Sequence, residues 1–157
     1  MRRKLFARLM LAVTATVVVC CLLTSGASAA AQSDVKPCSN QTIVGDYGGA
    51  SEGVLLGIPG LPPEAQFRGL TMTHFDGKGN LTWVEHTVIN GVPVQPGWIA
   101  ASGTYAVNPN CSGSAVINVP GNPLSPINLH FVVVKQGKEI HQVVDANAVT
   151  AVGNKVE

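Results

Sequence analysis

The sequence has few charged side chains, and neither sign dominates: ten lysines and arginines face nine aspartates and glutamates. Four of the ten basic residues lie within the first eight positions, in a segment with the features of a removable leader. Without that segment, six basic residues face nine acidic ones, a net charge of −3. The chain also has no charge run and no arginine interleaved with aromatics. This balance argues against nucleic acid and against anionic membrane surfaces as partners.

The sequence also lacks the short motifs that mark common enzyme and metal sites. It contains no GxSxG nucleophile elbow, and the glycine-rich GKGN stretch at 77–80 leads into a strand pattern rather than a phosphate-binding helix. His74, His86, His130 and His141 show no HxH or HxxxH spacing, although His74 and His86 fall on the two arms of one predicted hairpin. We therefore predict no metal and no cofactor, and we recognise no catalytic motif.

The first 29 residues have the pattern of a secretory signal peptide. A cationic start, MRRK, is followed by an apolar run at about 9–23 and by Ala27-Ser28-Ala29, which suits signal peptidase. The run is shorter than the roughly 20 apolar residues that a membrane-spanning helix needs. We expect a secreted protein, extracellular or periplasmic, with no membrane attachment after cleavage. It would consist of a flexible lead-in at 30–37 and one domain at 38–157.

Two cysteines, Cys38 and Cys111, remain once the leader and its own two cysteines are removed. An even number of cysteines in an oxidising compartment favours a disulfide, which would stabilise the fold by about 4 kcal/mol in the chain-entropy model. It would tie the start of the first strand to the turn before the fifth. A nucleophilic thiol or a metal ligand is the alternative, but neither cysteine has a histidine or a second cysteine near it in sequence.

After the leader there is no helical periodicity, and alternating apolar and polar residues predict short strands instead. Turn residues such as Asp76-Gly77, Asn90-Gly91 and the NPN run at 108–110 separate them. We predict pairing to resume near residue 97 after Asn90-Gly91, because prolines at 93 and 96 lack the N–H that a ladder needs. The expected strands cover 42–56, 67–75, 81–89, 98–107, 112–119, 127–134, 139–145 and 148–152.

Eight short strands with short connections predict an all-β protein, namely a single antiparallel up-and-down barrel after the N-terminal signal helix. Closure joins the first strand to the last and removes exposed edges. A barrel of about eight strands is either filled by side chains or just wide enough for one small ligand. The functional question is which of the two applies here.

Several strings resemble a group of uncharacterised secreted bacterial proteins that share an FDGxGN hairpin and a GTYxVNPxCxG turn. Here they are FDGKGNLT at 75–82 and GTYAVNPNCSG at 103–113, and the opening CSN at 38–40 and GDYG at 45–48 are similar too. The resemblance covers nearly the whole chain after the leader. It implies a calycin-type or allene-oxide-cyclase-like β-barrel, and it transfers no catalytic residue. Trp83 stands where a small residue is commoner in the group, which could partly fill a cavity.

In the third expected strand, Trp83, Glu85 and Thr87 share one face, and Val84, His86 and Val88 share the other. If the Trp83 face is inside, Glu85 is a carboxylate in an apolar lumen, suited to acid-base work or to holding a polar ligand group. Because glutamate is seldom buried without a partner, we favour the solvated alternative. Apart from Glu85, the candidate lumen residues are Phe75, Trp83, Tyr105 and Phe131.

Three functions are compatible with the sequence. The first is the binding of a small, mostly apolar molecule in the lumen. The second is a cyclase or isomerase that uses Glu85 as acid or base. The third is a structural or surface-interaction protein with a filled barrel. A cavity that reaches solvent favours the first two, a perturbed carboxylate inside it favours the second, and a packed interior favours the third.

Overall fold

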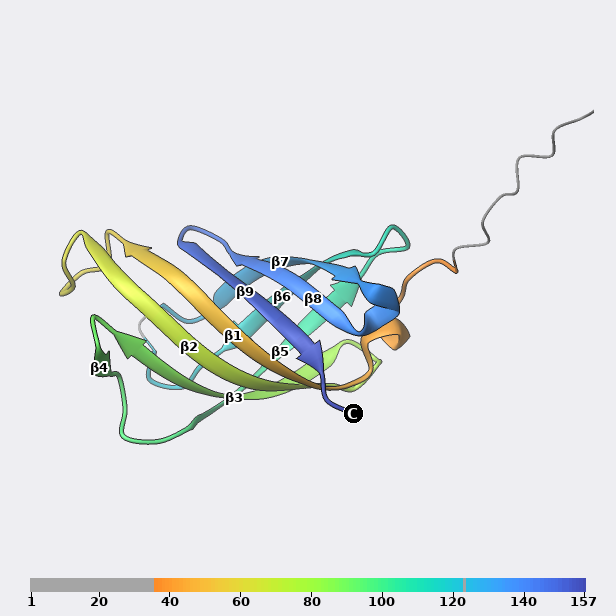
Figure 1. Ribbon diagram of the computed structural model, residues 1–157, viewed down its shortest axis with the longest axis horizontal. Coiled ribbons are helices and arrows are strands. Elements are labelled where there is room, and N and C mark those ends of the chain that lie inside the picture. Colours follow the sequence, from red (N-terminus) through yellow and green to blue (C-terminus); the bar gives the residue numbers. More distant parts are fainter. Residues whose placement is uncertain (1–35, 123) are drawn as a thin grey trace, which may run out of the picture. The chain divides into compact units, whose positions relative to one another are not determined.

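Eight antiparallel strands close into a barrel in the computed structural model, which describes residues 36–122 and 124–157 (Figure 1). The predicted single antiparallel up-and-down barrel is therefore confirmed. The predicted signal peptide at 1–29 and most of the lead-in at 30–37 lie outside the described residues. The barrel strands are β1 (Gly45–Leu56), β2 (Glu64–Phe75), β3 (Asn80–Ile89), β5 (Ile99–Val107), β6 (Ser112–Asn118), β7 (Ile127–Val134), β8 (Glu139–Val144) and β9 (Ala148–Lys155).

Strand pairing follows the order of the chain, and β1 closes the barrel by pairing with both β2 and β9. In the β1–β9 ladder Tyr47 lies opposite Lys155 and Val54 lies opposite Ala148. A ninth, two-residue strand, β4 (Val92–Pro93), pairs only with the end of β3. Every barrel strand therefore has a neighbour on both sides, as closure requires, whereas the short β4 is paired on one side.

Alternation of the side chains decides which residues enter the barrel. In β6, for example, Gly113, Ala115 and Ile117 are buried, whereas Ser114, Val116 and Asn118 are exposed. In β3 the buried or half-buried inward face carries Leu81, Trp83 and Glu85. The Trp83 face is therefore the inside of the barrel, as the period of two along each strand requires once one inward residue is known.

Two local features differ from the prediction. Residues 42–44 were expected to open the first strand, but residues 42 and 43 belong to the short 3₁₀ helix η1 (Asn40–Ile43) and residue 44 follows it. At the start of this helix the Ser39 N–H donates to Oγ1 of Thr42 at 2.9 Å. After the tight Asn90-Gly91 turn, where φ is 50° and 82°, pairing resumes at once in β4 and then stops until Ile99. The turn directs the chain straight back along β3: Pro93 itself belongs to β4, and the N–H of Val94 still donates to the carbonyl of Thr87 at 2.9 Å.

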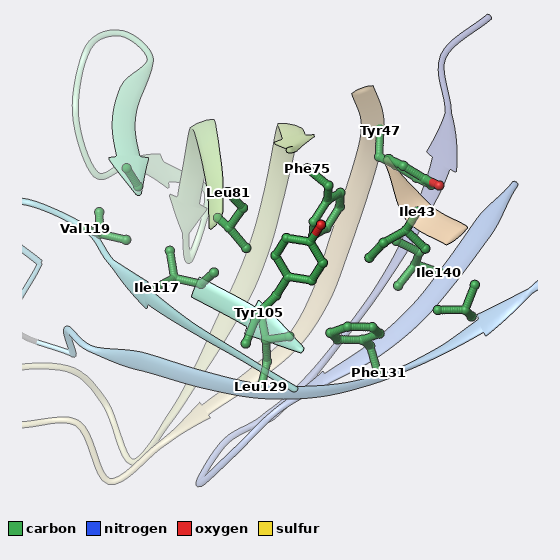
Figure 2. Packing of buried hydrophobic residues seen from close by; sticks show 13 residues of the cluster. Ile43, Tyr47, Phe75, Leu81, Tyr105, Ile117, Val119, Leu129, Phe131 and Ile140 are labelled. Carbon is green, nitrogen blue, oxygen red and sulfur yellow. The ribbon is translucent and has the colours of Figure 1, made fainter. Parts of the chain in front are cut away.

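Side chains fill one end of the barrel. Tyr47, Phe75 and Tyr105 form successive edge-to-face contacts, with ring centroids 5.4 and 4.9 Å apart, and Ile43 of η1 is fully buried beside them (Figure 2). The Tyr105 hydroxyl accepts a hydrogen bond from the N–H of Gly77 at 2.9 Å. Together with η2 (Lys135–Gly137), η1 therefore closes this end, which we call the closed end (at the right of Figure 1).

The predicted disulfide between Cys38 and Cys111 is present, with the two Cα atoms 5.0 Å apart. It joins the residues just before η1 to the turn between β5 and β6, and the N–H of Cys38 also donates to the carbonyl of Pro109 at 3.1 Å. The bridge therefore anchors η1, and with it Ile43, onto the closed end.

Candidate functional site

The opposite end of the barrel contains an open cavity of about 640 Å³, which we call the cup. Exposed residues at the strand end and in the loops, such as Leu56, Pro59 and Val94, form its rim, so it communicates with solvent. Its wall is mostly aliphatic, with one aromatic side chain, and the strand residues that line it include Leu55, Phe67, Ile89, Ile99, Ile127 and Val149. The interior is thus filled at one end and hollow at the other.

Most of the barrel strands contribute to both halves, so the boundary follows from position along the strand. On β3, Leu81 and Trp83 face the filled half, whereas Glu85, Thr87 and Ile89 line the cup. On β7, Leu129 faces the filled half and Ile127 lines the cup. Glu85 is therefore the first inward residue of β3 beyond the filled half, at the floor of the cup.

The filled half retains only a small internal pocket of about 20 Å³, close to the space of one water molecule. Trp83 lines this pocket, and its indole N–H is buried with no hydrogen-bond partner among the described residues. Phe131 fits there because Gly113 has no Cβ, which would lie 2.3 Å from the phenyl ring. Large aromatic side chains therefore occupy the volume that a ligand would need in this half.

Among the residues that the structure describes, Glu85 is the charged one that is buried, with 8% of its surface exposed. Its register partners are Thr71 on β2 and Ile99 on β5, neither of which carries a charge. No hydrogen bond or ion pair within 36–122 and 124–157 involves its carboxylate. Burial removes water from the charged form and raises the pKa of this carboxyl above its ordinary value.

The solvated position that we favoured for Glu85 is therefore wrong. The outward face of β3 carries Val84, which is exposed although it is apolar, while the inward face carries the carboxylate. The usual rule that charges point outward fails on this strand, and the inward direction is set by Leu81 and Trp83 packing into the filled half.

The charges that line the cup are all negative. Glu85 and Asp145 are its ionisable residues, and the described lining contains no lysine, arginine or histidine. Asp145 lies at the rim, where its carboxylate is 3.0 Å from Nδ1 of His130 and remains partly exposed. Glu85, at the floor, has no such partner.

The five candidate lumen residues all point into the barrel, but the structure divides them between its two halves. Phe75, Tyr105 and Phe131 belong to the packed core of the closed end (Figure 2). Trp83 lines the small internal pocket. Of the five, Glu85 alone lines the cup. The sequence reasoning missed the remaining cup residues, although Thr87 and Ile89 continue the inward face of Glu85 and follow from the same alternation.

The four histidines lie on the outer surface, each beside its own polar partner. Nδ1 of His74 is 2.7 Å from Asp46, and Nδ1 of His86 is 3.1 Å from the carbonyl of Gly97. His130 contacts Asp145 and His141 contacts Glu139. His74 and His86, on the two arms of the β2–β3 hairpin, do not meet: their register partners are Thr82 and Leu70. In the part of the chain that the structure describes, no group of three or more potential metal ligands comes together.

Fold and site together define the class of protein: an antiparallel eight-stranded barrel, disulfide-bonded at its closed end, with an apolar cup at the other. No protein-family model matches the chain, and no curated protein matches its sequence. Among the described residues, no helix has the length and apolar character needed to cross a membrane. The candidate functional site is the cup, which the barrel strands and the loops at the open end form together.

Proposed function

We propose that this protein is a secreted β-barrel that binds one small, mostly apolar molecule in the cup. The observation that carries the proposal is the cavity of about 640 Å³ with aliphatic walls and a few polar groups. Sites for small molecules are typically concave, roughly 300–1,000 Å³ in volume and mainly apolar, with a small number of placed polar groups. The cup has these properties, and a bound apolar molecule would remove its own apolar surface and that of the cup wall from water, which favours binding.

Secretion is supported by two independent features. The first 29 residues have the charge, apolar run and small-residue site of a signal peptide. The Cys38–Cys111 bridge is of the kind that forms and persists in oxidising compartments. The resemblance to secreted bacterial barrels of calycin or allene-oxide-cyclase type supports the same compartment.

A cyclase or isomerase acting in the cup is the second candidate, and Glu85 is the observation that favours it. Burial raises the pKa of the Glu85 carboxyl above its ordinary value, which suits it to proton transfer, and the cup could orient a substrate against it. This function would require a bound molecule to be converted in the native protein and to remain unchanged in Glu85→Gln. A purely structural barrel, the third candidate, accounts for the filled half but gives the cup no role.

Binding can be tested with N-phenyl-1-naphthylamine, an uncharged apolar probe whose fluorescence rises when it leaves water. We expect a saturable rise with the native protein. Thr87→Phe introduces a large side chain into the cup. It should weaken binding by about tenfold or more, because the phenyl ring occupies volume in which the probe would otherwise contact the apolar wall.

Thr82→Phe is the matched control, since Thr82 lies on the same strand but on the outer face. It should leave the fluorescence titration unchanged. Equal weakening by both substitutions, or no saturable signal with the native protein, would contradict binding in the cup.

A further inference from the structure

The floor of the cup holds a carboxylate that the fold itself leaves without a partner. Glu85 is flanked across the sheet by Thr71 and Ile99, and none of the hydrogen bonds or ion pairs of the described residues reaches it. Buried charges in proteins are ordinarily paired or bound to a metal. An unpartnered one that lines an open cavity is placed to receive its partner from outside.

The charge of the cup indicates what that partner is. Both ionisable groups that line it are carboxylates, and its described wall has no cation that would hold an anionic ligand. Asp145 already has His130 beside it, so the unsatisfied negative charge is the one at the floor. An anionic headgroup would be repelled there, whereas a primary ammonium could donate hydrogen bonds directly to the carboxylate.

We propose that the cup selects apolar molecules that carry a primary ammonium group, with the ammonium at Glu85 and the apolar body against the aliphatic wall. This inference rests on the proposed function and specifies the ligand class. The polar end of the ligand enters first, and the body then lies against Phe67, Ile89 and Val149 nearer the mouth.

The energetics favour such a ligand because the carboxylate is already desolvated in the folded protein, before any ligand binds. Forming a buried ion pair normally carries a large unfavourable desolvation free energy, because both charges leave water. Glu85 lost most of its water when the barrel folded, so on binding only the ammonium is desolvated, and the carboxylate gains a partner. A charged hydrogen bond in such a position supports a preference of about tenfold or more over an uncharged ligand of the same shape.

Three probes with the same alkyl chain separate this inference from simple apolar binding: decylammonium, decanol and decanoate. Each would be titrated near neutral pH, where an alkylamine is fully protonated, against native protein loaded with N-phenyl-1-naphthylamine. We expect decylammonium to displace the fluorescent probe at a concentration about tenfold or more below that of decanol, and decanoate to be the weakest.

Two conservative variants locate the effect. Glu85→Gln keeps the shape of the floor and removes its charge, so it should abolish the preference for decylammonium over decanol. Asp145→Asn removes the rim carboxylate and should preserve the preference.

The outcomes distinguish failure of this inference from failure of the proposed function. Equal displacement by decylammonium and decanol, or the strongest displacement by decanoate, would overturn the ammonium preference and leave the apolar cup intact. Loss of the preference in Asp145→Asn but not in Glu85→Gln would also overturn it. If the fluorescent probe itself does not bind the native protein, the proposed function fails, and this inference fails with it.

Discussion

At the scale of single residues, Glu85 opposes folding whenever it is ionised. Its pKa is raised in the folded protein, so the folded state binds a proton more readily than the unfolded one, and stability falls as pH rises. Below the ordinary value of 4.5 the carboxyl is protonated in both states and costs nothing extra. Above the folded pKa it is ionised in both states, and the full cost of burying the charge applies.

We therefore expect Glu85→Gln to raise the free energy of unfolding at about pH 8 and to have little effect at about pH 4. Urea denaturation at the two pH values measures the difference. Thr87→Val, a neutral change at the next inward position of β3, should show no such pH dependence. A Glu85→Gln variant that is less stable at about pH 8 would mean that the carboxylate makes a favourable interaction in the folded state.

The sequence could place Glu85 on the same face as Trp83, but it could not say that this face points inward. The two faces of β3 have similar apolar content, because Val84 and Val88 lie on one face and Trp83 and Ile89 on the other. The direction is decided by packing across the barrel, where Leu81 meets the aromatic core of the closed end. Contacts between residues far apart in sequence are not visible in the alternation of one strand.

At the scale of elements, the β2–β3 hairpin depends on Asp76. One oxygen of its carboxylate, Oδ1, accepts hydrogen bonds from the backbone N–H groups of Lys78, Gly79 and Asn80, at 2.7, 3.0 and 2.9 Å. The other, Oδ2, accepts from the side-chain amide of Asn80 at 2.8 Å. These bonds, led by that of the Asn80 side chain, favour the charged form and lower the pKa of Asp76 from 3.8 to about 2.

Because this pKa is depressed by folding, the ionised carboxylate stabilises the protein above about pH 4, and the contribution is lost as pH falls towards 2. We expect Asp76→Asn, which keeps an acceptor oxygen but not the charge, to be less stable than the native protein at about pH 6 and to approach it at about pH 2. Chemical denaturation at both values measures this.

Asp76→Ala serves as the comparison for the Asp76→Asn experiment. It removes the acceptor altogether and should remain less stable than the native protein even at about pH 2, since a protonated carboxyl still accepts from the backbone. If Asp76→Asn and the native protein differ equally at both pH values, the charge of Asp76 does not support the turn.

Turn chemistry was the most informative signal for the elements. Asp76-Gly77 and Asn90-Gly91 located two turns correctly because few residues other than Gly and Asn accept the positive φ found there. The 3₁₀ helix η1 was not predicted, since Thr42 and Ile43 also suit a strand. Its place is determined by Ile43 closing the barrel and by the disulfide beside it, both of which are long-range contacts.

At the scale of the whole barrel, eight alternating segments with short connections were sufficient to predict closure. They were not sufficient to predict that one half is filled and the other hollow. That division depends on where aromatic side chains gather along the axis: Tyr47, Phe75, Tyr105 and Phe131 come from four different strands but lie at the same end. Strand register, which the sequence alone does not determine, brings them to one level.

Because of this division, the contribution of the closed end to stability can be measured separately from the contribution of the cup to binding. The disulfide lies at the closed end and holds η1 over the aromatic core, whereas none of the residues that line the cup belongs to η1 or to the β5–β6 turn. Stability and binding should therefore respond differently to loss of the bridge. A double substitution, Cys38→Ser with Cys111→Ser, removes it without introducing bulk.

We expect the double variant to lose up to about 4 kcal/mol in the free energy of unfolding, because the bridge closes a loop of 73 residues and limits the unfolded chain. Its affinity for N-phenyl-1-naphthylamine, measured where it remains folded, should stay within about twofold of the native value, since the residues that line the cup lie away from the bridge and from η1. Unfolding by urea and the fluorescence titration give the two quantities on the same sample. A loss of affinity as large as that in Thr87→Phe would mean that the closed end sets the shape of the cup, and that the barrel acts as one unit in binding.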